Sequence, residues 1–495
     1  MKCLLALLLA AGPALAAFGA SVRVDTETRP AWACYHAAIA VGCSDSGPPP
    51  IYVAFENDSV PFTIQRSDIA FQRSTDAGRT WLAENIIIRQ GNRFACYPDL
   101  KVARDGTIHL VFTDRIDGSK GNIRATRSTD GGATWSAPVQ VDDSPSRVDI
   151  GWARLALDTA DNLFCAWTDK RGAFLRVYSD VSTDGGATWG TDARVDDDTV
   201  SFNCYPPDAW VQPGSNDHLV VADAPVRGPS GIVIHSHFYR STDAGRTWSP
   251  GVQLDTFSGV CRQPHVVADA GHVITDYTGN GYVNQSVTMA RTFFEAGDSW
   301  GPQVLITELD TIYSSFTNGA KLAIDLSGTV HTALQFCNRQ SFVYDVYYCR
   351  SDDHGLTWSE RELVNDAVAA DQWDPDIAVD ADGSAYVVWQ DMRNPKAQVW
   401  FATNAWTGIL APGPAPLPRL ACAPNPFRAG LAVTGVPAGR AVEVFDAAGR
   451  RVRLLPSRDG RARWDGRGQS GAPCPPGVYI IHVPGARPER VTRLR

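Results

Sequence analysis

Aspartate and arginine side chains recur together at the ends of apolar runs in this chain. The runs VFTDR (111–115), AWTDKR (166–171) and VVWQDMR (387–393) all end in this way. Carboxylates and guanidiniums that converge on one site can bind hydroxyl-rich or charged ligands through paired hydrogen bonds. A pair of carboxyl groups can also perform acid–base catalysis on a glycosidic bond, provided that one of them has a raised pKa.

A second phrase combines cysteine, aromatic, proline and acidic residues. It occurs as CYH (34–36), CYPD (96–99), CYPPD (204–208), CRQPH (261–265) and WDPD (373–376). Sugars are bound by flat aromatic surfaces together with a few polar partners, and the two phrases would supply both.

The two phrases and their neighbours supply the candidate ligand-binding residues, and no catalytic residue can be assigned among them. The candidates are Tyr97, Asp99, Asp114, Arg115, Trp152, Asp169, Arg171, Tyr205, Arg262, His265, Asp276, Tyr277, Trp373, Asp391 and Arg393. The alternative for any one of them is structural: Asp–Arg pairs can tie loops together, and Pro–Asp steps can begin strands.

A nine-residue phrase indicates which elements position these residues. RSTDAGRTW occurs twice, at 73–81 and 240–248, and related copies end at Trp135, Trp189 and Trp358. A degenerate copy, FFEAGDSW, ends at Trp300, and ATNAW at 402–406 keeps the tryptophan. Spacings of 48 to 59 residues between these tryptophans are typical of a propeller or solenoid repeat.

Each period contains short β-type runs separated by glycine, aspartate and proline, which predicts four antiparallel strands per unit. Counting the first strands predicts an all-β fold with a seven-bladed β-propeller, and a six-bladed ring is the alternative. The last unit stops after three strands near Trp406. VRVDT (22–26) resembles the fourth strands VQVDD (139–143), ARVDD (193–197) and VQLDT (252–256), so we expect the N-terminal strand to close the ring.

The aspartates of the nine-residue phrase are expected to hold turns rather than to catalyse a reaction. An aspartate two residues after a serine can accept hydrogen bonds from the turn, and the glycine permits a positive φ. The aspartates predicted to be structural are Asp76, Asp130, Asp184, Asp243 and Asp353.

The phrase S-x-D-x-G-x-T-W resembles the Asp-box, or BNR repeat, of the sialidase-like propellers, over about residues 21–408. The resemblance implies a β-propeller that is directed at glycans. The chain departs from the sialidase pattern in its count of blades, and Cys34-Tyr35-His36 stands where sialidases carry Arg-Ile-Pro. Function resides in the site and not in the fold, so hydrolysis of a sialidase type stays open beside a non-catalytic adhesion or protein-interaction scaffold.

The N-terminus indicates export. Lys2, an apolar core and an Ala-x-Ala site ending at Ala16 predict a signal peptide over residues 1–16. No other stretch is long and apolar enough for a transmembrane helix. We therefore expect a secreted or surface-attached bacterial protein.

The remaining ten cysteines suit disulfides in an exported protein, and the favoured pairs are Cys337–Cys349 and Cys422–Cys474. No cysteine–histidine cluster has zinc-ligand spacing, so no metal and no cofactor is expected.

The C-terminal segment differs from the rest in charge and in pattern. A proline-rich linker at 409–418 precedes a segment rich in arginine, which carries a net charge of +9 from residue 413 onward, against −9 for the whole chain. The acidic remainder argues against a nucleic-acid partner. PNPF (424–427), WDGRGQSG (464–471) and PPGVYIIHV (475–483) resemble the FlgD-like immunoglobulin fold of type IX secretion sorting domains.

We therefore predict a propeller over residues 17–408 and a small Ig-like β-sandwich over 419–495. The resemblance implies that the second domain engages the secretion machinery or the cell surface, and a permanent binding module is the alternative.

Overall fold

The computed structural model contains two compact units, Met1–Ile409 and Leu410–Arg495. It describes residues 18–29, 32–44, 47–58, 67–89, 94–117, 120–144, 148–197, 203–204, 206–228, 231–256, 261–282, 285–306, 312–313, 320–338, 343–367, 370–406, 420–436, 440–446, 451–458, 460–483 and 489–494. The predicted signal peptide, the predicted linker and the candidate Tyr205 lie outside these residues.

The first unit is built from consecutive antiparallel strands that form successive groups. The first groups are β2 (Ala33–Val41), β3 (Ile51–Asp58), β4 (Ser67–Ser74) and β5 (Ile86–Arg89); β6 (Phe94–Val102), β7 (Ile108–Asp117), β8 (Lys120–Ser128) and β9 (Val139–Gln140); and β10 (Val148–Leu157), β11 (Leu163–Asp169), β12 (Arg176–Ser182) and β13 (Ala193–Arg194). Edge pairs between β4 and β6, which are parallel there, and between β8 and β10 join these three groups in one sheet. Next come β14 (Asp208–Val211), β15 (His218–Gly228), β16 (Gly231–Ser241) and β17 (Val252–Gln253).

The later groups of the first unit carry small additions to the same pattern. They are β18 (Cys261–Ala268), β19 (His272–Tyr282), β20 (Gln285–Phe294), β21 (Ser299–Trp300) and β22 (Val304–Leu305); β23 (Ile312–Tyr313), β24 (Lys321–Ile324), β25 (Val330–Asn338), β26 (Tyr344–Ser351) and β27 (Glu362–Leu363); and β28 (Gln372–Val379), β29 (Ala385–Asp391) and β30 (Gln398–Thr403). A 3-10 turn at Glu295–Gly297 follows β20.

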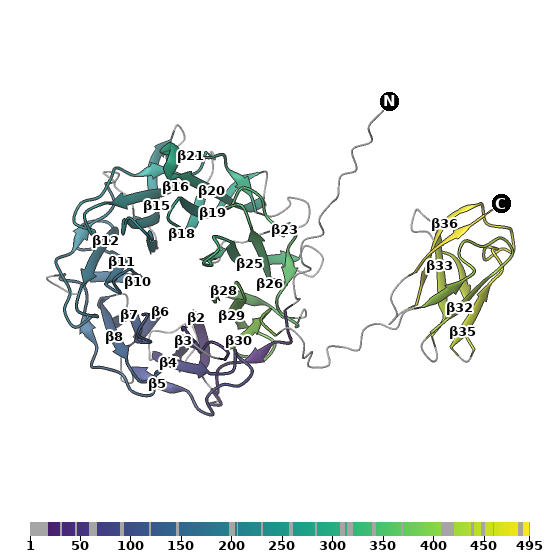
Figure 1. Ribbon diagram of the computed structural model, residues 1–495, viewed down its shortest axis with the longest axis horizontal. Helices are drawn as coiled ribbons and strands as arrows, with labels where there is room; N and C mark the ends of the chain where they lie inside the picture. Colours follow the sequence, from purple (N-terminus) through teal and green to yellow (C-terminus); the bar gives the residue numbers. More distant parts are fainter. Residues whose placement is uncertain are drawn as a thin grey trace. The chain divides into compact units, whose positions relative to one another are not determined.

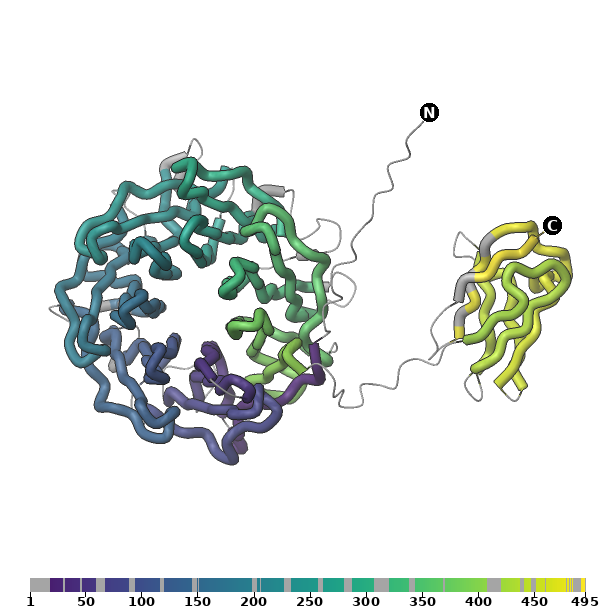
Figure 2. Tube along the Cα trace, viewed as in Figure 1, coloured from purple at the N-terminus to yellow at the C-terminus, as the bar shows by residue number. Residues whose placement is uncertain are grey.

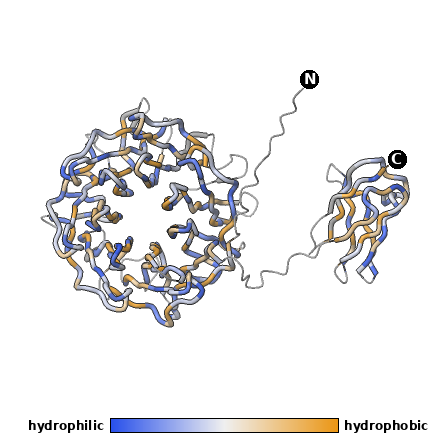
Figure 3. Tube along the Cα trace, viewed as in Figure 1, coloured by the Kyte–Doolittle hydropathy of each residue, from blue (hydrophilic) through white to orange (hydrophobic). Residues whose placement is uncertain are grey.

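The groups stand around a ring, with strands such as β2, β6, β10, β18 and β28 nearest the centre, which is the arrangement of a β-propeller (Figure 1). Hydrophobic and hydrophilic positions are interspersed along the chain of the ring (Figure 3). Buried apolar clusters form between neighbouring groups: one joins Phe71 of β4 to Leu110 and Phe112 of β7. Such clusters bury the two faces of each sheet, so the core of this unit is a series of layers between groups.

The Asp-box turns connect the third and fourth strands, and they share one set of hydrogen bonds. In the first copy, Asp76 Oδ1 accepts from Ser74 Oγ at 2.7 Å and from the Thr80 N–H at 2.9 Å, and Oδ2 accepts from Thr80 Oγ1 at 2.6 Å. Asp130, Asp184, Asp243 and Asp353 repeat this pattern. These bonds explain the turn-holding role that the sequence predicts for these aspartates.

The glycine of the turn permits a close contact with the neighbouring group. Gly132 has a φ of +88°, and a Cβ there would lie 2.1 Å from Cε1 of Phe71 in the preceding group. A side chain at this position would therefore clash with the ring, whatever its preferred backbone conformation.

Aspartates of the fourth strands bind the backbone of the third strands. Asp142 accepts from the Ile123 N–H at 2.7 Å, and Asp196 accepts from the Val177 N–H at 2.8 Å. In the N-terminal segment, Asp25 accepts in the same way from the Val399 N–H of β30 at 2.8 Å.

The N-terminal strand β1 (Val22–Arg23) lies antiparallel to β30, with Val22 opposite Phe401. Figure 2 shows this segment beside the last strands of the unit. The likeness of VRVDT to the other fourth strands thus reflects an equivalent hydrogen bond.

No disulfide bond joins cysteines within the described residues, and the hairpin of β25 and β26 shows why one expected pair was wrong. Cys337 lies opposite Tyr344, whereas Cys349 lies opposite Thr332. Each cysteine therefore lies five residues along its strand from the position opposite the other cysteine. The two do not face each other across the hairpin, as the sequence had suggested. Cys422 packs against the core that contains Cys474, and no disulfide joins these two.

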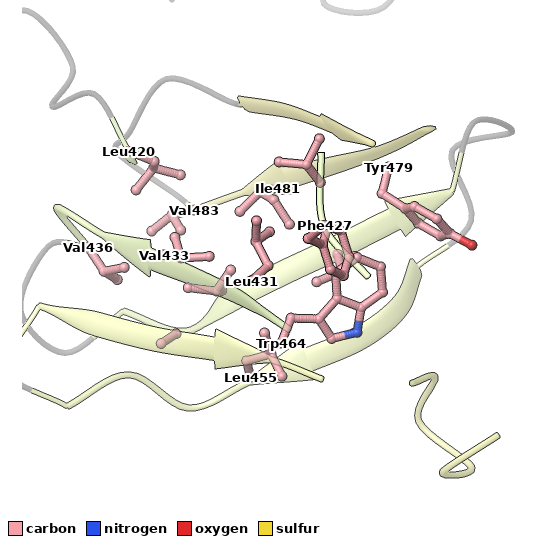
Figure 4. Close-up of a cluster of buried hydrophobic side chains, with 14 of the residues drawn as sticks. Leu420, Phe427, Leu431, Val433, Val436, Leu455, Trp464, Tyr479, Ile481 and Val483 are labelled. Atoms are coloured by element: carbon pink, nitrogen blue, oxygen red, sulfur yellow. The ribbon is translucent and has the colours of Figure 1, made fainter. Parts of the chain in front are cut away.

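The second unit consists of two small sheets that enclose one core. One sheet holds β31 (Ala421–Ala423), β32 (Leu431–Thr434) and β35 (Arg461–Trp464), and the other holds β33 (Val442–Asp446), β34 (Arg451–Leu455), β36 (Gly477–His482) and β37 (Glu489–Arg493). Trp464 lies between Phe427 and Tyr479, with ring centroids 5.3 and 4.9 Å away (Figure 4). Residues from both sheets join this cluster, so the unit is a β-sandwich.

Among the described residues, no helix is both long and apolar enough to cross a membrane.

Adjacent aspartates in one Asp-box provide a test of the turn. Asp353→Ala should lower the free energy of unfolding by about 1–2 kcal/mol, because it removes three hydrogen bonds of the turn. Asp352→Ala is the control, since this exposed side chain pairs with Arg350 at 3.5 Å on the surface. Urea denaturation should separate the two variants. Equal stability of both would show that the Asp-box carboxylate does not hold the turn.

Candidate functional site at the mouth of the central channel

The innermost strands of the ring line a cavity of about 490 Å³. Its walls come from β2, β6, β10, β14, β18, β24 and β28. From the first to the last residue of these strands, the residues that line the cavity change from aromatic and polar, through charged, to apolar, such as Val41, Val102 and Val379.

A β-bulge recurs at the polar end of the inner strands. In β6, the register shifts between Cys96 and Asp99, so that one extra residue is accommodated opposite β7. The same shift occurs in β2, β10, β18 and β28.

The bulge places a residue other than glycine in the left-handed region in each of these strands. These residues are His36 (φ 44°), Tyr97 (φ 52°), Trp152 (φ 55°), Gln263 (φ 57°) and Asp374 (φ 49°). All five line the cavity. The left-handed region is unfavourable for such side chains, and backbone strain of this kind is concentrated at functional sites.

Buried polar side chains of second strands hold the amides of three bulges. Glu56 Oε1 accepts from the Tyr97 N–H at 2.6 Å, and Asp223 Oδ2 accepts from the Gln263 N–H at 2.9 Å. Gln335 Oε1 accepts from the N–H of Asp374 at 3.1 Å. Each acceptor belongs to the group before the bulge that it holds, so the packing of neighbouring groups fixes the mouth of the channel.

Three aromatic side chains follow one another around part of the mouth. The ring centroids of His36 and Tyr97 are 4.9 Å apart, and those of Tyr97 and Trp152 are 5.4 Å apart. The guanidinium carbon of Arg115 lies 5.4 Å from the centroid of Tyr97. We call His36, Tyr97 and Trp152 the aromatic rim.

Carboxylates surround the imidazole of the rim. His36 Nδ1 lies 3.0 Å from Glu56 Oε1, and Nε2 lies 3.7 Å from Asp374 Oδ2. Burial opposes the charged imidazolium, but the attraction of Glu56 and Asp374 outweighs burial and raises the pKa of His36 to about 9. Burial and the nearby Glu56 raise the pKa of Asp58 to about 7.

Below the rim, charged side chains form a belt that is largely paired within itself. Asp99 accepts from Lys101 Nζ at 3.1 Å and from the Leu155 N–H at 2.7 Å. Arg154 Nε lies 3.9 Å from Asp208, and burial lowers the pKa of the neighbouring Lys321. Asp99 therefore lines the cavity, but its two oxygens hold the scaffold.

The structure divides the sequence candidates into two sets. Tyr97, Asp99, Trp152 and His265 line the cavity, and Arg115 adjoins the rim through Tyr97. The candidates that are not among the lining residues are Asp114, Asp169, Arg171, Arg262, Asp276, Tyr277, Trp373, Asp391 and Arg393.

Arg171 and Arg393 show why the repeated Asp–Arg pairs lie outside the cavity. Arg393 binds both oxygens of Asp391, at 2.9 and 2.8 Å, and its guanidinium carbon lies 3.6 Å from the ring centroid of Trp400. Arg171 binds Asp169 in the same manner and stacks on Tyr178 at 3.9 Å. Both arginines therefore hold loops, which is the structural alternative for these pairs.

Further candidates off the lining serve the scaffold. The hydroxyl of Tyr277 donates to the carbonyl of Leu254 at 3.3 Å within the core, and Asp114 lies 3.9 Å from Arg124 Nε. Asp276 accepts from the His265 N–H at 3.1 Å, and burial raises its pKa well above the usual range.

Four residues of the mouth were missed by sequence reasoning: His36, Glu56, Gln263 and Asp374. Three of them stand in the repeated phrases CYH, CRQPH and WDPD, where their left-handed position gives no signal in the sequence. Glu56 was detectable as a single acid in the apolar run IYVAFE.

A family model described as a BNR repeat-like domain matches residues 161–454, which is more than half of the chain. The match extends beyond Ile409 into the second unit. No curated protein matches the chain.

Solved structures also resemble the chain. A protein of unknown function from Dyadobacter fermentans is 14% identical over 78% of this chain and 97% of that one, with a TM-score of 0.48. A GH93 α-L-arabinofuranosidase of Fusarium graminearum is 12% identical, with the same coverage and TM-score. The NanB sialidase from Streptococcus pneumoniae is 10% identical over 74% of this chain and 93% of that one, with a TM-score of 0.46.

The raised pKa of His36 predicts a pH dependence of stability. The imidazole is protonated up to about pH 9 in the folded state but only to about pH 6.5 in the unfolded chain. Its contribution is therefore complete below about pH 6.5 and is lost as the pH rises through 9. His36→Gln should therefore lower the free energy of unfolding by about 1–2 kcal/mol more at low pH than at high pH. This difference is smaller than the full pKa shift implies, because 34% of the His36 side chain is exposed.

Thermal unfolding of both proteins between pH 6 and pH 10 measures this effect. The difference in stability between them should shrink as the pH rises. A constant difference over this range would contradict the assigned charge of His36.

Proposed function

The chain belongs to the BNR repeat-like domain family, and on this premise we propose that its propeller binds glycans at the mouth of the central channel. The observation that carries this proposal is the aromatic rim, with centroid separations of 4.9 and 5.4 Å between successive rings. Aromatic faces stack on the apolar faces of sugar rings. Asp374, which lines the cavity, and Arg115, which adjoins the rim, offer hydrogen-bond partners for hydroxyl groups.

Glycoside hydrolysis of a sialidase-like type is the second candidate function, and the raised pKa of Asp58 favours it. A glycosidase needs one carboxyl group that stays protonated near neutral pH and a second that is ionised. Asp58 has a pKa of about 7, and Glu56 lies two residues earlier on the same face of β3. Because Asp58 is not among the residues that line the cavity, binding is the primary proposal.

We further propose that the ring has seven blades and is closed by the N-terminal strand. The support comes from the pairing of β1 with β30 and from the hydrogen bond of Asp25 to Val399. Two more bonds join the first and last groups: Trp406 Nε1 donates to the Ala77 carbonyl at 2.8 Å, and the Ile39 N–H donates to Asp376 at 2.9 Å.

We also propose that the protein is exported through residues 1–16 and is secreted or attached to the cell surface. The second unit would then serve as a FlgD-like sorting or attachment domain that engages the secretion machinery. Its order of motifs from PNPF to PPGVYIIHV and its excess of arginine support this role.

Glycan binding is tested first with a glycan array and a panel of arylglycosides. Glycan binding without turnover would support the primary proposal, and cleavage of an arylglycoside would support the second candidate. Absence of any response to sugars would favour a protein-interaction scaffold.

Substitutions in the aromatic rim then locate the site. Tyr97→Ala and Trp152→Ala should each weaken binding of the glycan found on the array at least tenfold, because each removes a stacking surface that is worth about 1.4 kcal/mol or more. Trp400→Ala is the matched control, since this ring stacks on Arg393 outside the cavity. Calorimetric titration of folded variants measures the change. Unchanged affinity in both rim variants would contradict the proposed site.

Truncation after Gly408 tests the independence of the two domains. Residues 17–408 should unfold in one cooperative transition and keep the glycan affinity of the mature chain, because the N-terminal strand supplies the edge of the last group. Scanning calorimetry and the same titration provide the comparison. Loss of the transition would show that the tail is part of the propeller, and loss of affinity alone would place ligand contacts in the tail.

A further inference from the structure

Two histidines and one aspartate cluster at the end of the propeller that carries the Asp-boxes. Asp269 and His272 belong to the turn between β18 and β19, and His354 belongs to the Asp-box between β26 and β27. Antiparallel order puts both kinds of turn at the end of the strands opposite the bulges, so this cluster is remote from the aromatic rim. The ligand atoms of the three side chains all lie within 4.8 Å of one another.

The repeat shows that His354 is an exception at its position. The residue before the Asp-box glycine is Ala77, Gly131, Gly185 or Ala244 in the other complete copies. Each of these has a positive φ, and His354 adopts the same conformation, with a φ of 57°. Histidine adopts the left-handed region more readily than most side chains, but the turn itself needs only a small residue there. The requirements of the Asp-box therefore do not explain this imidazole.

His272 is an exception at a second, independent position of the repeat. The equivalent residues of other turns between first and second strands are Thr107, Asn162, Thr329 and Ser384. In each case the backbone N–H of the residue donates to the turn aspartate, as the His272 N–H does to Asp269 Oδ1 at 2.8 Å. The imidazole of His272 adds a nitrogen beside both oxygens of Asp269, of which the backbone of the turn uses only Oδ1.

The two imidazoles both contact the carboxylate of Asp269. His354 Nδ1 lies 3.1 Å from Asp269 Oδ2, and His272 Nδ1 lies 3.1 Å from Oδ1 and 3.3 Å from Oδ2. The two rings stack at a centroid separation of 3.8 Å and an angle of 14°. The ligands of a tetrahedral metal ion with bonds of about 2.0–2.1 Å are separated by about 3.3 Å, which matches the nitrogen–oxygen distances. The stacked rings would turn apart on binding, because an imidazole nitrogen binds a metal ion in the plane of its ring.

The backbone around the cluster leaves it accessible. About 26–31% of each of the three side chains is exposed. Gly328, in the turn between β24 and β25, approaches the site closely: a Cβ there would lie 2.9 Å from His354 Cε1. The three side chains are therefore partly accessible to solvent, whereas Nδ1 of His354 is itself buried, so an ion binds there only if the His354 ring moves.

We propose that Asp269, His272 and His354 bind a divalent transition-metal ion of the Zn²⁺ type. Imidazole nitrogens with one carboxylate oxygen form a ligand set that suits Zn²⁺. The ion would brace two neighbouring groups of strands, because His354 and Asp269 come from different groups. Sequence reasoning expected no metal because it found no cysteine–histidine cluster with zinc-ligand spacing. Asp269 and His272 are separated from His354 by more than eighty residues, and only the ring brings them together.

Isothermal titration of the full mature chain with Zn²⁺, free of any histidine tag and treated first with a chelator, tests this site. Wild type should bind one equivalent of Zn²⁺, and its melting temperature should rise in the presence of the ion. His272→Ala and His354→Ala should each weaken binding at least tenfold and abolish the rise. The melting temperatures without metal establish that each variant is folded.

Two matched variants make the result specific. His237→Ala removes an imidazole outside the cluster and should keep the wild-type affinity. Asp269→Asn should lose affinity, whereas Asp380→Asn, which alters the same turn in another group, should not. The proposal is overturned if wild type does not bind Zn²⁺, or if the cluster variants and the controls bind it equally, because the three side chains then form hydrogen bonds only.

Discussion

The hydrogen bond that a buried or half-buried aspartate of one inner strand accepts from the backbone N–H of the next is the interaction on which the ring depends. Asp99 accepts from Leu155, Asp208 from Val266, and Asp376 from Ile39. An inner strand is narrow and has a free edge at the centre of a propeller, so its backbone N–H groups need acceptors that the neighbouring sheet cannot supply. A carboxylate meets this need and at the same time sets the distance between adjacent groups. A buried carboxylate is costly unless it is well bonded, which ties this interaction to correct packing.

The mouth of the channel follows from that spacing. Bulge residues such as Tyr97 and Gln263 adopt strained backbone conformations, and their amides are bound by Glu56 and Asp223 of the preceding groups. The strain is tolerated because the surrounding groups are fixed. The same hydrogen bonds thus hold neighbouring groups together and shape the candidate site. Carboxylates are therefore abundant near the channel, although several of them only stabilise the fold.

Much of the architecture could be predicted from the sequence because the repeat is local. The Asp-box turn is specified by residues within nine positions, as the bonds of Asp76 to Ser74 and Thr80 show. The likeness of VRVDT to other fourth strands reflects a single carboxylate–backbone bond, that of Asp25 to Val399.

The site was harder to predict, because its residues are selected by register and by contacts between groups. Arg115 and Arg393 both follow an aspartate at the end of a second strand, so the sequence cannot distinguish them. Arg115 lies beside the rim, whereas Arg393 binds Asp391 within its own loop. It also could not find the left-handed bulges, which are decided by the pairing of two strands. The predicted disulfide between Cys337 and Cys349 was wrong for the same reason, because the spacing of two cysteines does not show the register of the strands that carry them.

The central claim is that the aromatic rim binds the ligand and that the Asp-box end of the ring does not. A crystal structure of the protein soaked with the glycan selected on the array measures this most directly. Electron density for a sugar ring is expected against Tyr97 or Trp152, with hydroxyl groups within hydrogen-bond distance of Asp374 or Arg115. Density for the sugar on the Asp-box turns, with an empty channel mouth, would contradict it.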